Sequence, residues 1–165
     1  MSRAEQAAQK VQSLCDAVLA EAAQLPGEIL IWQPAPEVWS VMDILCHIEE
    51  FVPYWTAQVF QIVHHSDRKW GRDHTDAARR AAVENTVART LFDVEKHIRA
   101  AAVQSAASLR KLNDTDLDVE VPSCNARWGN KPASFIVEHL LVAHLEKHLG
   151  QIRRNVLQYP NVVTT

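Results

Sequence analysis

Three histidines have the residue type and spacing expected of a metal site. His144 and His148 lie four residues apart in PASFIVEHLLVAHLEKHLGQIRRN, so on a helix they face the same side and can present two imidazoles to one ion. His47, in WSVMDILCHIEEF, lies between Ile44 and Phe51 on the apolar face of another predicted helix. Three neutral nitrogen ligands leave one coordination position open, as in catalytic sites. Zn²⁺ and Ni²⁺ suit imidazole best, and Fe²⁺ is a further candidate.

Other interpretations of these histidines remain open at this stage. A histidine on an apolar stripe is often a hydrogen-bonded core residue, and a pair can form a solvated cluster at one end of a bundle. Two competing signatures are absent from the sequence: H-E-x-x-H of zinc proteases, and E-x-x-H, which a ferritin-like di-metal bundle needs twice. A site with a single ion is therefore the form of metal binding that the sequence favours.

Residues beside the histidines are candidates for supporting roles. Glu50 follows His47 by three residues, so it is a candidate to orient a ligand or to act as a general base, with a partly exposed helix acid as the alternative. Gln151, three residues after His148, is a candidate hydrogen-bond partner near the site or a helix–helix contact. Cys46 points about 100° away from His47 on a helix and is expected to be buried rather than nucleophilic.

Apolar residues recur at helical spacing in four segments, which predicts helices over residues 3–24, 40–64, 77–112 and 132–157. Only 4 glycines and 7 prolines interrupt the chain, which favours long helices over a fold with many turns. The connections after the first three helices are long. The sequence thus predicts an all-α, antiparallel four-helix bundle forming a single domain over residues 1–165.

Local signals mark several helix boundaries. Ser40 and Asp43 form an S-x-x-D start signal, and Pro132 is expected in the first turn of the fourth helix. Pro53 lies inside the second helical pattern, so a kink or a break into two helices is expected there. The connection before Pro132 is expected to include a short extended piece.

Aromatic and histidine residues in the connections have less specific roles. Trp32 and Trp39 are expected to anchor the first connection to the core, whereas Trp70 and Trp128 are expected at a pocket mouth or a dimer interface. The remaining histidines are interpreted mainly as residues outside the metal site: His64, His65, His74, His97 and His139. A second, adventitious metal site formed by His64, His65 and His74 is an alternative.

Bulk properties exclude several classes of function. The formal net charge is -3, so no basic face for nucleic acid is indicated. No apolar run approaches the roughly 20 residues of a membrane span, and the N-terminus lacks the apolar region of a signal peptide. Three widely spaced cysteines do not form a disulfide pattern. A cytoplasmic protein with neither nucleic-acid nor membrane partners is expected.

Two sequence blocks resemble the DinB-like superfamily of YfiT-like metalloenzymes. WSVMDILCHIEE is similar to the family's Trp-Ser start followed by a helix with an inward histidine, and HLLVAHLEKHLGQIRR is similar to its terminal H-x-x-x-H-x-G-Q signature. The resemblance implies a four-helix bundle, metal binding by His47, His144 and His148, and a homodimer. It also implies chemistry dependent on a low-molecular-weight thiol. The family name refers to DNA damage and does not imply DNA binding.

The leading functional prediction is an enzyme with a mononuclear three-histidine metal site acting on a small molecule. A low-molecular-weight-thiol transferase or isomerase is the form implied by the resemblance, and a metal-dependent hydrolase is the alternative. A rival from another class is a non-enzymatic, dimeric, stress-associated or binding protein with structural histidines.

Overall fold

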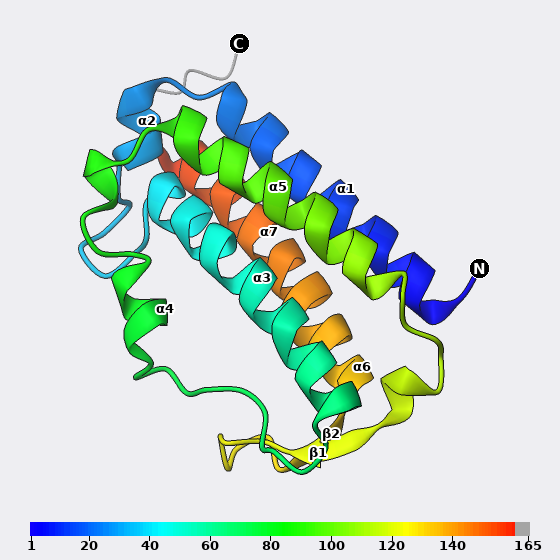
Figure 1. Cartoon of the computed structure of the whole chain (residues 1–165). Coiled ribbons are helices and arrows are strands. Elements are labelled where there is room, and N and C mark those ends of the chain that lie inside the picture. Colours follow the sequence, from blue (N-terminus) through cyan, green and yellow to red (C-terminus); the bar gives the residue numbers. More distant parts are fainter. Residues whose placement is uncertain (161–165) are drawn as a thin grey trace.

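Four long helical segments form the bundle in the computed structural model, which describes residues 1–160 (Figure 1). The first three segments are α1 (Arg3–Ala23), α3 (Val41–His64) and α5 (Leu91–Leu109). The fourth is continuous and consists of α6 (Ala133–Phe135), the π-helix η3 (Ile136–Val142) and α7 (Ala143–Gln158). The predicted all-α four-helix bundle is confirmed.

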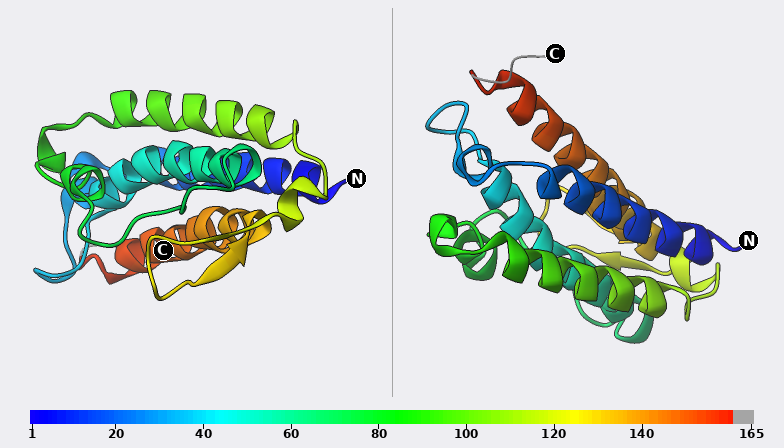
Figure 2. Two further views of the ribbon diagram at one scale, coloured as in Figure 1. Left: turned by 60° about the horizontal axis from the view of Figure 1, so that its bottom comes forward. Right: turned by 90° about the horizontal axis from the view of Figure 1, so that it is seen from above.

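The order of the helices around the bundle differs from their order in the chain. Helix α1 packs on α5 and α7, and α3 packs on α5 and on the η3–α7 segment, so α1 and α3 lie at opposite corners (Figure 2). Apolar side chains from all four segments fill the space between them. The consequence for function is that α3 lies directly beside α7, and these two helices carry the three candidate ligands.

Helix α3 begins where the sequence predicts. The Asp43 N–H donates to Ser40 Oγ (3.1 Å), and the Ser40 N–H donates to the Asp43 carboxylate (2.8 Å), which completes a capping box. The helix then continues through Pro53 to His64, so the expected alternative of a break into two helices is wrong. Helix α3 is therefore one continuous element on both sides of His47.

The predicted helix over residues 77–112 is wrong in its first part. The chain instead forms α4 (Ala77–Ala81), a 3₁₀ turn η1 (Thr86–Ala88) and then α5. Asn85 adopts a left-handed conformation (φ 53°), and Thr90 starts a new helix by accepting a hydrogen bond from the Asp93 N–H (3.2 Å). Val87 had the spacing of a core residue, but it is 69% exposed. Because the chain is not helical between α4 and α5, α4 can pack against α3.

The other connections also contain short elements. A short helix, α2 (Gly27–Ile31), lies in the long connection predicted after the first helix. After the 3₁₀ turn η2 (Asp116–Asp118), strands β1 (Glu120–Pro122) and β2 (Asn130–Pro132) form an antiparallel pair, which confirms the expected extended piece. Pro132 precedes the first turn of α6 rather than lying within it.

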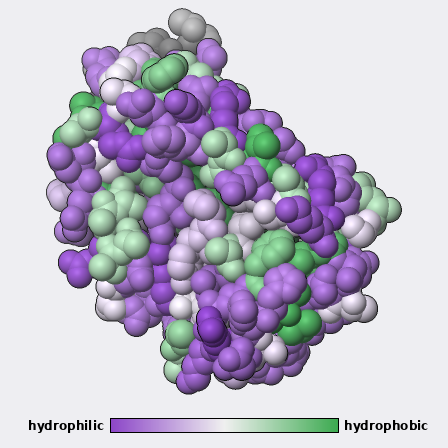
Figure 3. All heavy atoms as spheres, in the orientation of Figure 1, coloured by the Kyte–Doolittle hydropathy of each residue, from purple (hydrophilic) through white to green (hydrophobic). Residues whose placement is uncertain are grey.

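The outer surface of the bundle is mainly polar. Hydrophilic side chains cover most of the face seen in Figure 1, and the apolar side chains there form separate, smaller groups (Figure 3). None of the helices in residues 1–160 combines the length and the apolar character needed to cross a membrane.

Candidate metal centre

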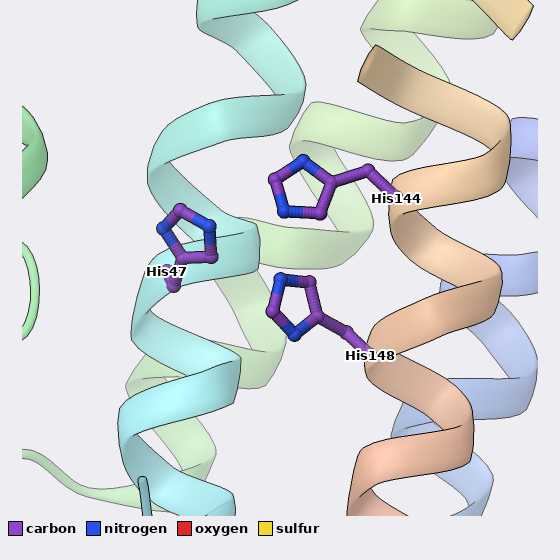
Figure 4. Close-up of side chains that lie close together, drawn as sticks. All are labelled: His47, His144 and His148. Atoms are coloured by element: carbon purple, nitrogen blue, oxygen red, sulfur yellow. The ribbon is translucent and has the colours of Figure 1, made fainter. Parts of the chain in front are cut away.

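The three histidines predicted as ligands come together between α3 and α7. His47 projects from α3 toward His144 and His148, which lie one turn apart on α7 (Figure 4). Each residue offers one ring nitrogen, and these three nitrogens lie within 4.8 Å of one another. The ring centroids are 5.3 Å (His47–His144), 5.0 Å (His47–His148) and 4.6 Å (His144–His148) apart.

The cluster lies in aromatic surroundings. His47 is 2% exposed and His148 is 3% exposed, whereas His144 is half-buried. The Phe51 ring stacks on His144 with centroids 4.4 Å apart, and the Trp39 ring lies 5.0 Å from His47 and 6.1 Å from His148. These rings exclude water from the inner side of the cluster, so the half-buried His144 marks the side that a small molecule can reach.

Burial keeps the three imidazoles in the state that binds metals. It lowers the pKa of His47 to about 2, and repulsion from His148 and His144 acts in the same direction. Burial also lowers the pKa of His144 to about 3 and that of His148 to about 4, with repulsion from Lys147 as a further cause in both. All three rings are therefore neutral at pH 7, and each keeps a nitrogen lone pair for coordination.

The hydrogen bonds at the cluster leave ligand atoms free. Gln151 Oε1 lies 3.1 Å from His148 Nδ1, and an amide oxygen can only accept, so Nδ1 carries the proton and Nε2 keeps its lone pair. That Nε2 and His47 Nδ1 are buried and have no hydrogen-bond partner among residues 1–160. Unpartnered buried nitrogens are costly, and a cation between them would satisfy both. The residues present thus fit a divalent metal.

The size of the cluster also suits one ion. Around a tetrahedral ion with bonds of about 2.1 Å, ligand nitrogens lie about 3.4 Å apart, so small rotations of the rings suffice to close on it. The three histidines are the single group of three or more metal-ligating side chains at this spacing within the described chain. His64, His65 and His74 do not form a second such group.

Two features of the fold set the position of these side chains. The π-helix η3 ends at Val142, two residues before His144, and such segments are frequent at functional sites. Asn155 Nδ2 donates to the Trp39 carbonyl oxygen (2.7 Å), which holds the segment before α3 against α7. Trp39 thereby covers the cluster, in agreement with its predicted anchoring role.

Glu50 lies on α3 but is bound to another side chain. Its two carboxylate oxygens each accept a hydrogen bond of 2.6 Å from Arg72, whose guanidinium also stacks on Tyr54 and contacts Asp76. Arg72 follows Gly71, which has φ +85°, a conformation that glycine adopts most readily. A general-base role for Glu50 stays a prediction. In the structure its carboxylate contacts Arg72 and holds that guanidinium in place.

The remaining sequence predictions have different outcomes. Cys46 is buried, and burial raises the pKa of its thiol to about 11, in agreement with its expected structural role. Trp70 is fully buried, and its Nε1–H donates to the Val121 carbonyl oxygen (2.7 Å), so its expected place at a pocket mouth or interface is wrong. Trp128, in contrast, lines a cavity that reaches His47 and His144.

Three cavities adjoin the cluster, one of which touches it at His144 alone, and the two that reach His47 are lined by several basic side chains that sequence reasoning missed. A cavity of about 200 Å³ reaches His47 and His144 and is bordered by Arg72, Arg79 and Arg127. A second, of about 350 Å³, reaches all three histidines and is bordered by Arg79, Lys147 and Arg154. The one sequence signal was the basic pair after Gln151; nothing local predicted that Arg79 lies beside the cluster.

Comparison with known proteins agrees with this fold. A model of the DinB superfamily matches residues 5–152. No curated protein matches the sequence significantly. YfiT from Bacillus subtilis, described as a probable metal-dependent hydrolase with an unusual four-helix bundle topology, superposes with a TM-score of 0.80 at 11% identity, covering 96% of this chain and 89% of YfiT.

A mycothiol-dependent maleylpyruvate isomerase superposes with a TM-score of 0.69 at 9% identity, covering 90% of this chain. The match spans 60% of the isomerase, so this chain corresponds to part of that protein. At such identities the two structures show a shared fold. Because the family model spans most of the sequence, the chain belongs to the DinB superfamily.

Proposed function

We propose that this chain is a metal-dependent enzyme in which His47, His144 and His148 hold one divalent ion next to a cavity for a small molecule. Zn²⁺ and Ni²⁺ are the preferred candidates for this ion, and Fe²⁺ is the third. The observation that carries the proposal is the pair of buried, unpartnered nitrogens, His47 Nδ1 and His148 Nε2, in a cluster of neutral imidazoles. A bound ion would act as a Lewis acid, polarising a group of the substrate.

The chain's own residues prepare the site for such chemistry. Gln151 fixes the tautomer of His148, so that Nε2 faces the cluster without a proton. Phe51 and Trp39 exclude water on the inner side, which strengthens electrostatic interactions in the site. Glu50 holds Arg72 at the cavity wall through two hydrogen bonds, so we assign it a positioning role beside its predicted one as a general base.

The concrete form of the reaction that we favour is transfer or isomerisation dependent on a low-molecular-weight thiol. It is supported by the resemblance of the two histidine blocks to the superfamily and by the shared fold with an isomerase that depends on mycothiol. A metal-dependent hydrolase is the second candidate. YfiT, described as a probable hydrolase, favours it because the superposition covers nearly the full length of both chains.

Metal binding is tested on protein purified without chelators. Elemental analysis should find close to one equivalent of a divalent metal, and the double variant His144→Ala, His148→Ala should lose it while circular dichroism stays unchanged. His65→Ala is the matched control, because His65 is exposed and lies outside the cluster. Wild-type protein that takes up no Zn²⁺ or Ni²⁺ would instead support the rival, a non-enzymatic protein with structural histidines.

The two reaction types are separated with the cobalt-substituted protein. A thiol-dependent enzyme should show a change in its visible spectrum when a low-molecular-weight thiol is added, because sulfur ligation alters the ligand field. A hydrolase should show no such change and should cleave ester or amide substrates in the absence of thiol. The homodimer and the cytoplasmic location remain predictions; light scattering of the purified protein tests the first.

A further inference from the structure

The basic side chains around the metal centre do not reflect the composition of the chain. The protein has 17 Lys and Arg against 20 Asp and Glu. Yet the two cavities that reach His47 are bordered by five basic side chains and by one acid, Asp73, whose carboxylate accepts hydrogen bonds from Thr75. The five are Arg72, Arg79, Arg127, Lys147 and Arg154.

Four of these five cations have no acidic partner. Arg72 is neutralised by Glu50 and Asp76. No ion pair joins Arg79, Arg127, Lys147 or Arg154 to a carboxylate within residues 1–160. Arg79 donates a hydrogen bond to the His74 carbonyl oxygen instead (3.4 Å). Elsewhere on the helices some basic residues pair with acids, such as Arg99 on α5 and Arg153 on α7, whereas exposed ones such as Lys10 and Lys96 have no ion pair within residues 1–160. The four unpaired cations at the histidines differ from these because they converge on cavities.

Arg79 has a central place in this arrangement. It is half-buried, it borders both cavities, and it lies on α4, the short helix that folds back over α3. Its charge reaches the histidines, since repulsion from Arg79 contributes to the lowered pKa of all three. A cation placed beside a metal site weakens metal binding unless an anion offsets it.

The charge balance indicates what the cavities hold. Three neutral imidazoles leave the full charge of a divalent ion uncompensated, and four unpaired cations add to it. Fixed cations that converge on a concave site bind carboxylate or phosphoryl oxygens through charge-assisted hydrogen bonds. A neutral or cationic substrate would leave this charge in place.

We propose that the molecule bound beside the metal centre is a small polyanion, bearing carboxylate or phosphoryl groups, and that Arg79 and Lys147 are its principal specificity residues. This inference rests on the proposed function, since it names the substrate class of the same site. Arg79 joins the two cavities, and Lys147 lies on α7 between the two histidine ligands, so an anion in either cavity meets at least one of them.

The test measures anion binding to the metal-free protein at constant ionic strength by calorimetry. Succinate is the carboxylate probe, methylphosphonate the phosphoryl probe, and succinamide the neutral counterpart of succinate. We expect an anion to bind and succinamide not to bind. Arg79→Gln and Lys147→Gln should each weaken anion binding about tenfold or more, the usual effect of losing a charged hydrogen bond.

Matched controls separate a local site from general surface charge. Arg80→Gln removes the same charge one residue from Arg79, at an exposed position outside both cavities. Lys96→Gln does so on α5. Both controls should change binding less than twofold. Binding of succinate alone identifies a carboxylate ligand, and binding of methylphosphonate alone a phosphoryl ligand. The proposal is overturned if neither anion binds, if succinamide binds equally, or if the controls match Arg79→Gln.

The design keeps this inference apart from the metal proposal. The same titration on the His144→Ala, His148→Ala variant needs no metal. If the wild-type protein takes up no metal but binds an anion, the anion site is supported and the proposed metal-dependent enzyme is refuted. If the wild-type protein binds one equivalent of metal but no anion, the metal site is supported and the anion site is refuted.

Discussion

Acid should destabilise the metal-free protein through the three clustered histidines. In the unfolded chain an imidazole has a pKa of about 6.5 and binds a proton as the pH falls below that value. In the fold, burial holds the pKa of His47, His144 and His148 at about 2, 3 and 4. The unfolded state therefore binds more protons than the folded state below pH 6.5, and the free energy of unfolding decreases as the pH falls.

The size of the effect follows from these values. At pH 7.5 the three imidazoles are neutral in both states and contribute almost nothing. At pH 5.5 each histidine favours the unfolded state by RT ln(1 + 10), about 1.4 kcal/mol, because all three folded-state values lie below that pH. Together they should remove about 4 kcal/mol, a large share of the roughly 5–15 kcal/mol that stabilises a typical domain.

Urea unfolding at the two pH values, with chelator present, measures this change. The variant His144→Gln, His148→Gln should lose only about 1.4 kcal/mol over the same range, since one of the three histidines remains. Other titrating groups are common to both proteins and cancel in the comparison. If wild type and variant lose equal stability between pH 7.5 and 5.5, the imidazoles are not held neutral by burial, and their assignment as ready metal ligands fails.

Three further substitutions test particular contacts. Gln151→Leu removes the acceptor at His148 Nδ1 and should weaken Zn²⁺ binding about 10- to 100-fold in a competition assay, with the fold retained; unchanged affinity would deny Gln151 an orienting role. Glu50→Gln leaves the mostly buried Arg72 guanidinium with Asp76 as its one carboxylate partner and should lower the free energy of unfolding by about 2 kcal/mol in urea. Thr90→Ala removes the cap of α5 and should cost about 1 kcal/mol, seen as a lower Tm, whereas no change would mean that the break before α5 does not depend on this cap.

The sequence was sufficient to predict that the three histidines converge, because the apolar residues around them recur at helical spacing. His144 and His148 share a face with Leu141 and Ile152, and His47 shares one with Ile44 and Phe51; burial of those apolar faces turns the histidines inward. Two helices buried against each other then bring the ligands together. This inference needs only the helical repeat and the apolar stripes, both visible in the chain.

The break between α4 and α5 was missed because two signals conflicted. Val83 and Val87 continued the apolar spacing of α5, while Asn85, Thr90 and Asp93 carried local signals for a turn and a new helix start. The local signals prevailed, because the Thr86 hydroxyl also donates a hydrogen bond to the buried Asp43 carboxylate on α3. That contact joins residues 43 positions apart and has no signature in the local pattern.

The same break explains why the basic side chains could not be predicted. On one unbroken helix over residues 77–112, Arg79 would extend along the line of α5. The break lets α4 pack on α3, and this places Arg79 beside His47 and His144. Arg127 reaches the same cavity from the connection between β1 and β2. Such placements depend on how the connections fold over the bundle, which no single segment encodes.

The bundle and its connections therefore contribute different parts of the site. The α3–α7 pair supplies the histidines and Lys147, and their positions are fixed by the buried faces of two long helices. Arg72, Arg79 and Arg127 stand on the connections, where substitutions disturb the core less. Changes in those connections should alter which anion binds without removing a ligand atom, since none of these three side chains belongs to the histidine cluster. Loss of the Arg79 charge should in addition strengthen metal binding when no anion is present. The proposed metal ligands and the proposed anion-binding side chains therefore lie on different parts of the fold and can be substituted independently.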